Sequence, residues 1–514
     1  MAVTRISGMA SGLDIDALVK QLMQAEKKPL DKLNQSKQLL EWKRDNYREV
    51  STKIVTFAQS KINDIFSKSA SLNAQSASVS GNKTAVTVNA SSSASGVLDI
   101  SVKELAVAAS IKSSPISNPT KTNTAEKDWG KVKLSEINGS DIDTSEITIG
   151  GIPIQIDKDT ETLSSFVNKI NSNSSFPVTA VYDSATGKIS LTSKATGAAG
   201  NDITLSGNIF TALGLEIAAG ESTLKLSKGS DAQITVNGLD MSQSSNKFSL
   251  NGFDITLNEK SNGTATHVEV TKDVDKIVEN VQSFVDSYNE LLSYMNGMVN
   301  EERYTKYSPL TSEQKKEMSE SEIELWEKKA KSGMLKRDSI LQSTLSSMRT
   351  AMIESVDGIK LSDGTTLDLT KLGITTGTYE TNGKLILDKD KLKQAIEKDP
   401  NIVNDFFGKE YSTSFLNNEY TKSDGILARL KKISNNTLST LATTAGTSKV
   451  STDLSASFNT DSSMGRELYS LDRRILDMES KLTRKETNYY KKFTAMETAI
   501  NKYNSVQSSL SSFL

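Results

Sequence analysis

The side chains that most often carry enzyme chemistry are nearly absent from this chain. Its 514 residues include no cysteine and a single histidine, His267. This composition excludes thiolate nucleophiles, disulfides, and zinc sites built on cysteine or on paired histidines. A Ser-His-Asp triad would have to use His267, which lies in the alternating stretch "TATHVEVTKD" with no nucleophile elbow nearby. We therefore predict that His267 is an ordinary strand residue.

Paired carboxylates are the remaining candidates for acid–base chemistry or calcium binding. Asp14 with Asp16, and Asp388 with Asp390, supply the necessary groups. Such pairs arise easily among 63 acidic residues, and helix capping or a solvated helix face accounts for them. The glycine-rich stretches "SGMASGLD" and "TGAAGND" lack the fingerprint of a phosphate or dinucleotide loop. We predict no catalytic residue, no cofactor and no metal site.

Charge and hydropathy argue against two further classes of partner. The net charge is −2 with acidic and basic residues interspersed, which gives no electrostatic case for nucleic acid or an anionic membrane. No apolar run approaches the roughly 18 residues that a membrane span requires, so we expect no membrane insertion. The opening stretch "MAVTRISGMASGLDIDALVKQLM" has no unbroken apolar segment. No cleaved signal peptide is predicted.

Apolar residues at helical spacing concentrate at both ends of the chain. A helix is predicted after a cap at Asp14 or Asp16, with a kink or restart at Pro29. A final helix is predicted from about Met464, and about 50 helical residues would span roughly 75 Å. One compact domain cannot bury the stripe of such a helix, so these stripes favour self-assembly or packing on a partner helix over internal packing alone. The expected assembly positions are Leu13, Ile15, Leu18, Leu22, Leu33, Leu40, Leu468, Leu471, Ile475, Met478, Leu482, Tyr489, Phe493, Met496, Ile500, Tyr503, Leu510 and Phe513.

Between the helical ends, period-two alternation predicts β structure. The stretches "AQITVNGLDM" and "KFSLNGFDITLNE" place Asn-Gly between alternating residues, and "VTAVYDSATGKISLTS" is also typical of a hairpin. The predicted fold class is α+β multidomain, in which long helical, coiled-coil termini and a helical leg domain flank β-rich head domains. The expected parts are terminal coiled-coil helices at 1–40 and 464–514, a mainly helical leg domain at 41–68 and 272–463, a β-rich head domain at 69–110 and 230–271, and a second β-rich (α+β) head domain at 111–229.

Several stretches together resemble the flagellar filament-capping family, also called hook-associated protein 2. They are "SGLDIDALVKQLMQAEKKPLDKL", "GVLDISVKELAVAASIKS", "FVDSYNELL", "GKLILDKDKLKQAIEKDPNIVNDFF" and the final helix. The resemblance covers nearly the whole chain in the expected order, and its combined motifs are highly specific. The charged segment 304–335 is similar to the version found in Gram-positive bacteria. Residues 111–229 are the least diagnostic of the family.

The resemblance implies a structural assembly factor and not an enzyme. Family members form a homo-oligomeric ring at the distal end of the filament, where flagellin folds and inserts beneath them. The implied partners are therefore other copies of this chain, flagellin, hook-filament junction proteins, the flagellar export apparatus and an export chaperone. The implied location is extracellular, at the filament tip, reached without a cleaved signal peptide.

Two alternatives remain open from the residues. A flagellin-like or hook-filament junction subunit would also place helices at both ends of the chain, and the stretch "SGLDIDALVKQLM" argues against it by resemblance. A secreted hydrolase or adhesin would use the head domains to bind carbohydrate, but no acid pair or aromatic platform identifies such a site. The assembled form separates the first alternative from a cap: a flagellin-like subunit should polymerise into filaments, whereas a cap should stop at small closed rings.

Overall fold

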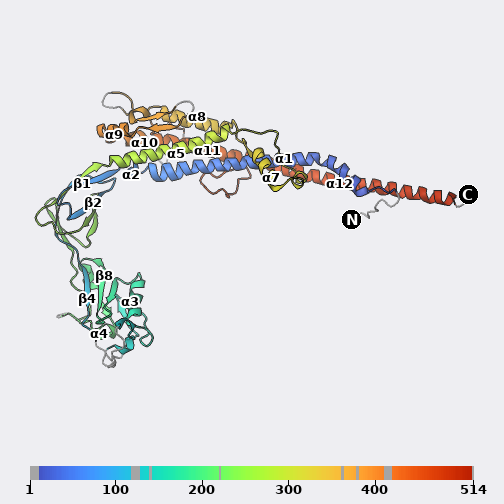
Figure 1. Cartoon of the computed structure of the whole chain (residues 1–514). Coiled ribbons are helices and arrows are strands. Elements are labelled where there is room, and N and C mark those ends of the chain that lie inside the picture. The colour runs from blue at the N-terminus through green and yellow to red at the C-terminus, as the bar shows by residue number, and fades with distance from the viewer. Residues whose placement is uncertain are drawn as a thin grey trace. The chain divides into compact units, whose positions relative to one another are not determined.

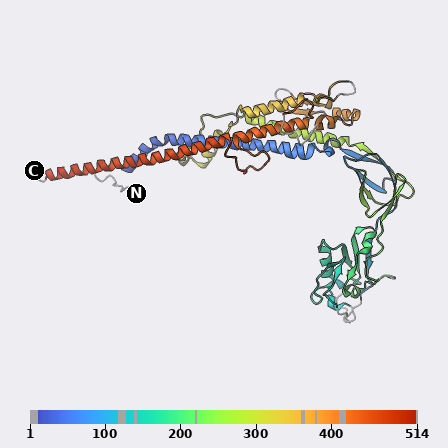
Figure 2. The ribbon, with the colours of Figure 1, turned by 180° about the vertical axis from the view of Figure 1, so that it is seen from behind.

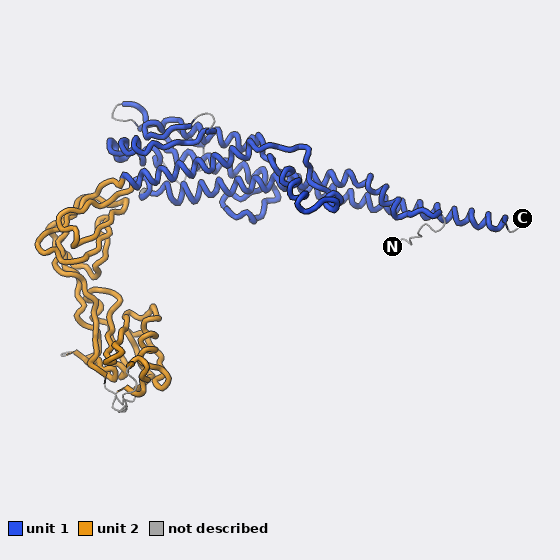
Figure 3. The backbone as a smooth tube through the Cα atoms, viewed as in Figure 1, with its two compact units in different colours: residues 1–73, 274–514 blue, residues 74–273 orange. Residues whose placement is uncertain are grey.

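The computed structural model describes residues 11–116, 128–137, 142–218, 222–359, 364–377, 381–409 and 419–511. The chain divides into two compact units, coloured separately in Figure 3. Unit 1 joins residues 1–73 to residues 274–514, and unit 2 comprises residues 74–273. Unit 1 is therefore assembled from both ends of the chain.

Unit 1 is mainly helical (Figures 1 and 2). Its one described sheet pairs two short strands, β15 and β16, in antiparallel fashion. Its elements are α1 (Ile15–Val55), the π-helix η1 (Thr56–Phe66), α2 (Ser69–Leu72), α5 (Val274–Asn300), α6 (Ser312–Lys316), α7 (Glu320–Lys331), α8 (Ser339–Ile353), the short 3₁₀ helix η5 (Leu369–Leu372), β15 (Ile374–Thr376), β16 (Leu385–Leu387), α9 (Lys389–Lys398), α10 (Ile402–Gly408), α11 (Ile426–Ala445) and α12 (Ser463–Ser511).

Helix α1 begins where the sequence predicted. Asp14 caps it, with its carboxylate accepting a hydrogen bond from the Ala17 amide at 2.9 Å. The helix does not restart at Pro29, because α1 continues without interruption to Val55. Proline removes one backbone donor and crowds the preceding turn. Pro29 is solvent-exposed, so water can satisfy the carbonyl left without its helical partner.

The bundle of unit 1 is packed most deeply around α11, which contacts α1, α8, α10, α12 and η1. Every residue from Ile426 to Ser434 is buried, so this part of the helix has no solvent face. Arg429 lies inside and donates hydrogen bonds to the backbone carbonyls of Asp424, Ala351, Glu354, Ser355 and Lys422 at 2.7–3.0 Å. Burial of this guanidinium is tolerated because its donors are satisfied.

One core of unit 2 lies between a five-stranded sheet, in the order β1-β14-β3-β10-β11, and a three-stranded sheet, in the order β12-β13-β2. The predicted Asn-Gly turns join β10 to β11 and β12 to β13. Asn237 and Asn251 have φ values of 49° and 50°, the left-handed conformation that such two-residue turns require. The strands are β1 (Gln75–Gly81), β2 (Val86–Ala90), β3 (Val97–Glu104), β10 (Ala232–Val236), β11 (Leu239–Gln243), β12 (Lys247–Leu250), β13 (Phe253–Leu257) and β14 (Thr266–Lys272).

A second core of unit 2 forms around helix α3, whose apolar face packs with residues from two three-stranded sheets. The sheets have the orders β4-β8-β7 and β6-β5-β9, and β7 with β8 is the third predicted hairpin. The elements are β4 (Ala108–Lys112), η2 (Trp129–Lys131), η3 (Leu134–Glu136), β5 (Thr148–Ile149), β6 (Ile152–Pro153), α3 (Leu163–Ser172), β7 (Val178–Tyr182), β8 (Ile189–Thr196), η4 (Ala198–Asp202), β9 (Leu205–Ser206) and α4 (Asn208–Ala212). The predicted α+β multidomain class is confirmed.

Candidate assembly interface

The two terminal helices, α1 and α12, pack against each other (Figure 2). Ile15, Val19 and Met23 of α1 and Leu482 of α12 form a buried apolar cluster. Half-buried residues extend this cluster on both helices: Leu30, Met478, Tyr489, Tyr490 and Phe493. Part of the predicted C-terminal stripe is therefore covered by the other end of the same chain.

Polar contacts fix the register of α12 against α1. Lys485 donates to Glu26 at 2.5 Å and the Tyr489 hydroxyl donates to the same carboxylate at 3.1 Å. The hydrogen bond from Lys485 is the main reason that the pKa of Glu26 is lowered. Lys37 pairs with Asp472 at 2.7 Å further along. These contacts match residues 26–37 of α1 with residues 472–485 of α12, running in opposite directions.

Two arginines of α1 clamp the loop between α11 and α12. Arg44 donates to the carbonyls of Ala445 at 2.6 Å and Asn459 at 2.9 Å. The guanidinium carbons of Arg44 and Arg48 lie 4.1 and 3.8 Å from the ring centroid of Phe458, a cation–π arrangement. The loop is thereby held on α1 at the point where α12 begins, and this sets the direction in which α12 leaves the bundle.

The last part of α12 is uncovered by the described chain. Every residue from 501 to 511 is exposed, and Tyr503, Val506 and Leu510 are 75%, 49% and 60% exposed. These residues continue the three- and four-residue spacing of the covered stripe. The apolar stripe thus has a portion covered by α1 and a portion that remains exposed.

The structure separates the predicted assembly positions into three groups. Ile15, Leu471 and Leu482 are buried, and Leu13, Leu22, Tyr503 and Leu510 are exposed. Phe513 lies outside the described residues. The remaining predicted positions are half-buried: Leu18, Leu33, Leu40, Leu468, Ile475, Met478, Tyr489, Phe493, Met496 and Ile500.

Sequence reasoning missed part of the α1 contact. Val19 and Met23 are buried against α12, whereas the predicted Leu18 and Leu22 lie on a neighbouring side of the helix. Both pairs have a spacing of four residues, so periodicity alone could not choose between them. Ile15 and Leu30 continue the Val19–Met23 row at three- and four-residue steps through Glu26, and this continuity was the available signal.

The charged segment between α5 and α8 docks on α1. We call residues 301–338 the excursion. Lys27 of α1 lies 3.8 Å from Glu313, and Gln35 donates to the Pro309 carbonyl at 2.8 Å. Within the excursion, Trp326 packs on Tyr307 with ring centroids 4.6 Å apart and donates to the Ser308 carbonyl. The excursion is therefore a small folded element attached to α1.

Three of the four carboxylates considered for acid–base chemistry have structural roles. Asp14 and Asp388 cap α1 and α9, as the capping interpretation predicted. The backbone hydrogen bond from Lys391 is the main cause of the lowered pKa of Asp388. Asp16 accepts a hydrogen bond from the Tyr490 hydroxyl at 2.9 Å, between the terminal helices. His267 is a residue of strand β14, as predicted, and its Nδ1 lies 2.7 Å from an Asp99 carboxylate oxygen.

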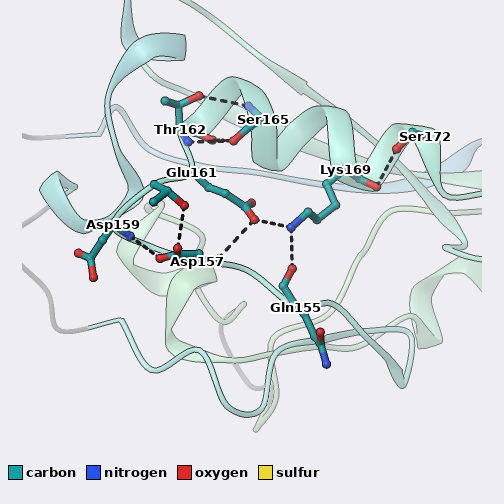
Figure 4. Close-up of polar contacts among 9 residues, drawn as sticks. Gln155, Asp157, Asp159, Glu161, Thr162, Ser165, Lys169 and Ser172 are labelled. Carbon is teal, nitrogen blue, oxygen red and sulfur yellow. Dashed lines mark hydrogen bonds and ion pairs between the residues drawn. The ribbon is translucent and has the colours of Figure 1, made fainter.

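A cluster of polar residues in unit 2 surrounds the start of α3 (Figure 4). Thr162 and Ser165 form a reciprocal capping box. Lys169 pairs with Glu161 and donates to the Gln155 carbonyl at 2.7 Å. Asp157 accepts from the Thr160 hydroxyl at 2.8 Å, the main cause of its lowered pKa. These contacts hold the loop before α3 in place, so a structural role accounts for the cluster.

Comparison with known proteins assigns the family. The family model described as "Flagellar hook-associated protein 2 C-terminus" matches residues 229–505, and its N-terminal counterpart matches residues 11–109. A flagellar hook-associated protein 2 from Halalkalibacterium halodurans is 30% identical over 99% of both chains. The chain belongs to the flagellar hook-associated protein 2 family. Its relative in Escherichia coli strain K12 is 26% identical over 78% of this chain and 80% of the relative.

Membership of the flagellar hook-associated protein 2 family agrees with the fold. A crystal structure of the D1-D2-D3 domains of the flagellar cap protein FliD from Escherichia coli matches 79% of this chain and 97% of that chain, with a TM-score of 0.51 and 23% identity. The two family models leave residues 110–228 unmatched between them, and these include all of the buried residues of the second core of unit 2 except Ala109. Among the described residues, no helix has the length and apolarity of a membrane span, and no group of three or more acidic or histidine residues could hold a metal ion.

Proposed function

We propose that this chain caps the distal end of a bacterial flagellar filament as a ring of identical copies, beneath which flagellin folds and inserts. Its family membership over nearly the whole chain supports the role. The observation that carries the mechanism is the exposed end of α12, where Tyr503, Val506 and Leu510 face solvent. Covering these side chains removes apolar area from water, which stabilises the assembled form.

We propose that the predicted assembly residues have two roles along the terminal helices. We propose that the covered cluster around Ile15 and Leu482 keeps α12 on α1, while the exposed positions from Tyr503 onward contact flagellin and neighbouring copies. Leu13 and Leu22, which are 47% and 41% exposed, add apolar surface on the α1 side. The terminal-helix, leg and two head-domain boundaries stated from the sequence remain part of this proposal.

The implied route to the filament tip is also a proposal. We infer export through the flagellar export apparatus with an export chaperone and without a cleaved signal peptide. The absence of cysteine suits transport as an unfolded chain, because no disulfide has to be broken or formed. The intact mass of the chain recovered from sheared filaments tests this route. A mass that lacks an amino-terminal segment would contradict it.

Electron microscopy of a deletion strain tests the cap role directly. Cells without this chain should have short or absent filaments and should release monomeric flagellin into the medium. Expression of the chain in the same cells should restore full-length filaments. Normal filaments in the deletion strain would reject the proposal. Open-ended polymers formed by the purified chain would favour the flagellin-like alternative instead.

A further inference from the structure

A second helical stripe runs along the side of α12 that faces away from α1. Its members recur at steps of three and four residues, and they include three cations and no carboxylate. Tyr469 and Leu476 in this stripe are 67% and 63% exposed. We call this set the outer stripe: Arg466, Tyr469, Arg473, Leu476, Ser480 and Arg484.

The cations of the outer stripe are available to a partner. Within the described part of the chain, the side chains of Arg473 and Arg484 make no ion pair or hydrogen bond, and both residues are exposed. Arg466 donates to the backbone carbonyl of Asp461, so its charge is not neutralised. A surface that combines exposed apolar residues with unpaired cations matches a partner that offers apolar residues and carboxylates.

The excursion carries such a surface. The nine residues "EMSESEIEL", from Glu317 to Leu325, contain four glutamates and no cation. All four glutamates are exposed, and none makes an ion pair within the described residues. Leu325, at the end of the segment, is 66% exposed. We call residues 317–325 the acidic edge.

The outer stripe and the acidic edge lie at the same level along α1 but on different sides of it. Glu26 of α1 contacts Lys485 of α12, whereas the next residue, Lys27, contacts Glu313 of the excursion. Successive residues of a helix are rotated by about 100°, so α12 and the excursion occupy separate faces of α1. Figures 1 and 2 agree, because the excursion with α7 lies in front in the first view and α12 lies in front in the second.

We propose that the outer stripe of one copy binds the acidic edge of the next copy. The inference rests on the proposed cap function and names a lateral contact of the ring. A contact between two different patches is heterologous and can close into a ring. A symmetric contact of either patch with itself would bring like charges together, which is unfavourable. Two copies side by side with parallel α1 axes would place the cations of the outer stripe against the glutamates of the acidic edge, and Tyr469 and Leu476 beside Leu325.

Thiol cross-linking of the full-length chain tests the contact, because the native chain contains no cysteine. Leu476→Cys and Leu325→Cys variants are mixed and treated with a short bismaleimide at concentrations where the wild-type chain associates. We expect cross-linked dimers in the mixture and little in either variant alone. Mixing Leu476→Cys with Val450→Cys, a position 73% exposed in the loop before α12, is the matched control.

Charge reversal provides the second measurement. Arg473→Glu with Arg484→Glu should weaken association by about tenfold or more, and Glu320→Lys with Glu324→Lys should do the same. Mixing the two double variants should restore association between them, because each then presents the complement of the other. Three results would overturn the contact. The first is cross-linking of the Leu476→Cys variant alone with the same yield as its mixture with Leu325→Cys. The other two are a wild-type chain that stays monomeric at every concentration and mixed charge-reversed variants that fail to associate.

Filament growth in the deletion strain separates this inference from the proposed function. If the wild-type chain and both charge-reversed variants restore filaments equally, the lateral contact is wrong and the cap function stands. If the wild-type chain fails to restore filaments, the cap function is wrong, and the ring contact that rests on it is rejected as well. Restoration by the wild-type chain, with loss in each reversed variant and recovery on their coexpression, supports both.

Discussion

Helices α11 and α12 lie in the same unit, but they are covered to very different extents. In α11, all nine residues from Ile426 to Ser434 are buried, including three cations. In α12, only five of 49 described helical residues are buried. The bundle around α11 covers its own apolar surface and pairs its three buried cations with backbone carbonyls or with Asp424, whereas α12 leaves the end of its stripe and its outer face to solvent. The contrast supports the proposal that α12 contacts other molecules, whereas α11 stabilises unit 1 from within.

The largest expected effect comes from the buried guanidinium of α11. Arg429→Met should lower the free energy of unfolding of unit 1 by about 3–5 kcal/mol, because five backbone carbonyls lose their donor in a buried site. Urea unfolding followed by circular dichroism measures the change. The matched control is Arg473→Met on the outer stripe, which should shift stability by less than about 0.5 kcal/mol. Equal effects of the two substitutions would remove the distinction between the helices.

A substitution in the loop between α11 and α12 should have an intermediate effect on the free energy of unfolding. Phe458→Ala removes the ring that lies against Arg44 and Arg48, and we expect a loss of about 1–2 kcal/mol for this contact. Hydrogen exchange should quicken in the loop 447–462 and the first turns of α12. Val450→Ala in the same loop serves as the comparison, since Val450 is 73% exposed. Unchanged exchange in Phe458→Ala would show that the clamp does not hold the loop.

Burial of Lys431 in α11 should make the stability of unit 1 depend on pH. Lys431 donates to the Ala58 carbonyl of η1 at 2.7 Å, and burial lowers the pKa of its ammonium from 10.5 to about 8. Between these values the unfolded chain holds the proton and the folded chain releases it, so stability should rise with pH. The gain is at most about 1.4 kcal/mol per pH unit.

Urea unfolding at pH 7.5 and 9.5 measures this gain for the wild-type chain and for Lys431→Met. The variant should lack the contribution, because it has no group to titrate at this position. If both proteins show the same change between the two pH values, Lys431 is not its source.

The smallest effect on stability is expected at the tip of α12. Tyr503→Ser with Leu510→Ser should change the free energy of unfolding by less than about 0.5 kcal/mol, because both side chains are already in solvent. Filament length in the deletion strain should nevertheless fall sharply. Normal filaments with this double variant would show that the exposed end of the stripe has no role in capping.

Much of the fold was predictable because it depends on local patterns. Asp14 as a helix cap and the Asn-Gly turns at Asn237 and Asn251 follow from backbone preferences that short sequences express. The interior position of Arg429 was not predictable, because the carbonyls that receive its hydrogen bonds come from Ala351 to Ser355 as well as from nearby residues. The spacing of apolar residues in α11 carries no information about where those carbonyls lie.

The candidate site was predictable in outline only. The stripe of α12 identified the helix face, but the four-residue spacing in α1 fitted two adjacent rows. The row of Val19 and Met23 differs from that of Leu18 and Leu22 only in its continuation to Ile15 and Leu30, and packing with α12 confirms that row. The outer stripe was missed because its apolar members, Tyr469 and Leu476, are few and are separated by cations. The docking of the excursion on α1 depends on contacts such as Gln35 with Pro309, between segments far apart in the sequence.

Hydrogen exchange of residues 501–511 tests the central claim most directly. The full-length chain is measured once at dilute, monomeric concentration and once as caps on filaments. We predict fast exchange of these amides in the monomer and strong protection in the cap, because neighbouring molecules cover the exposed stripe only after assembly. Strong protection in the dilute monomer, unchanged in the cap, would show that the chain covers this helix by itself and would contradict the account.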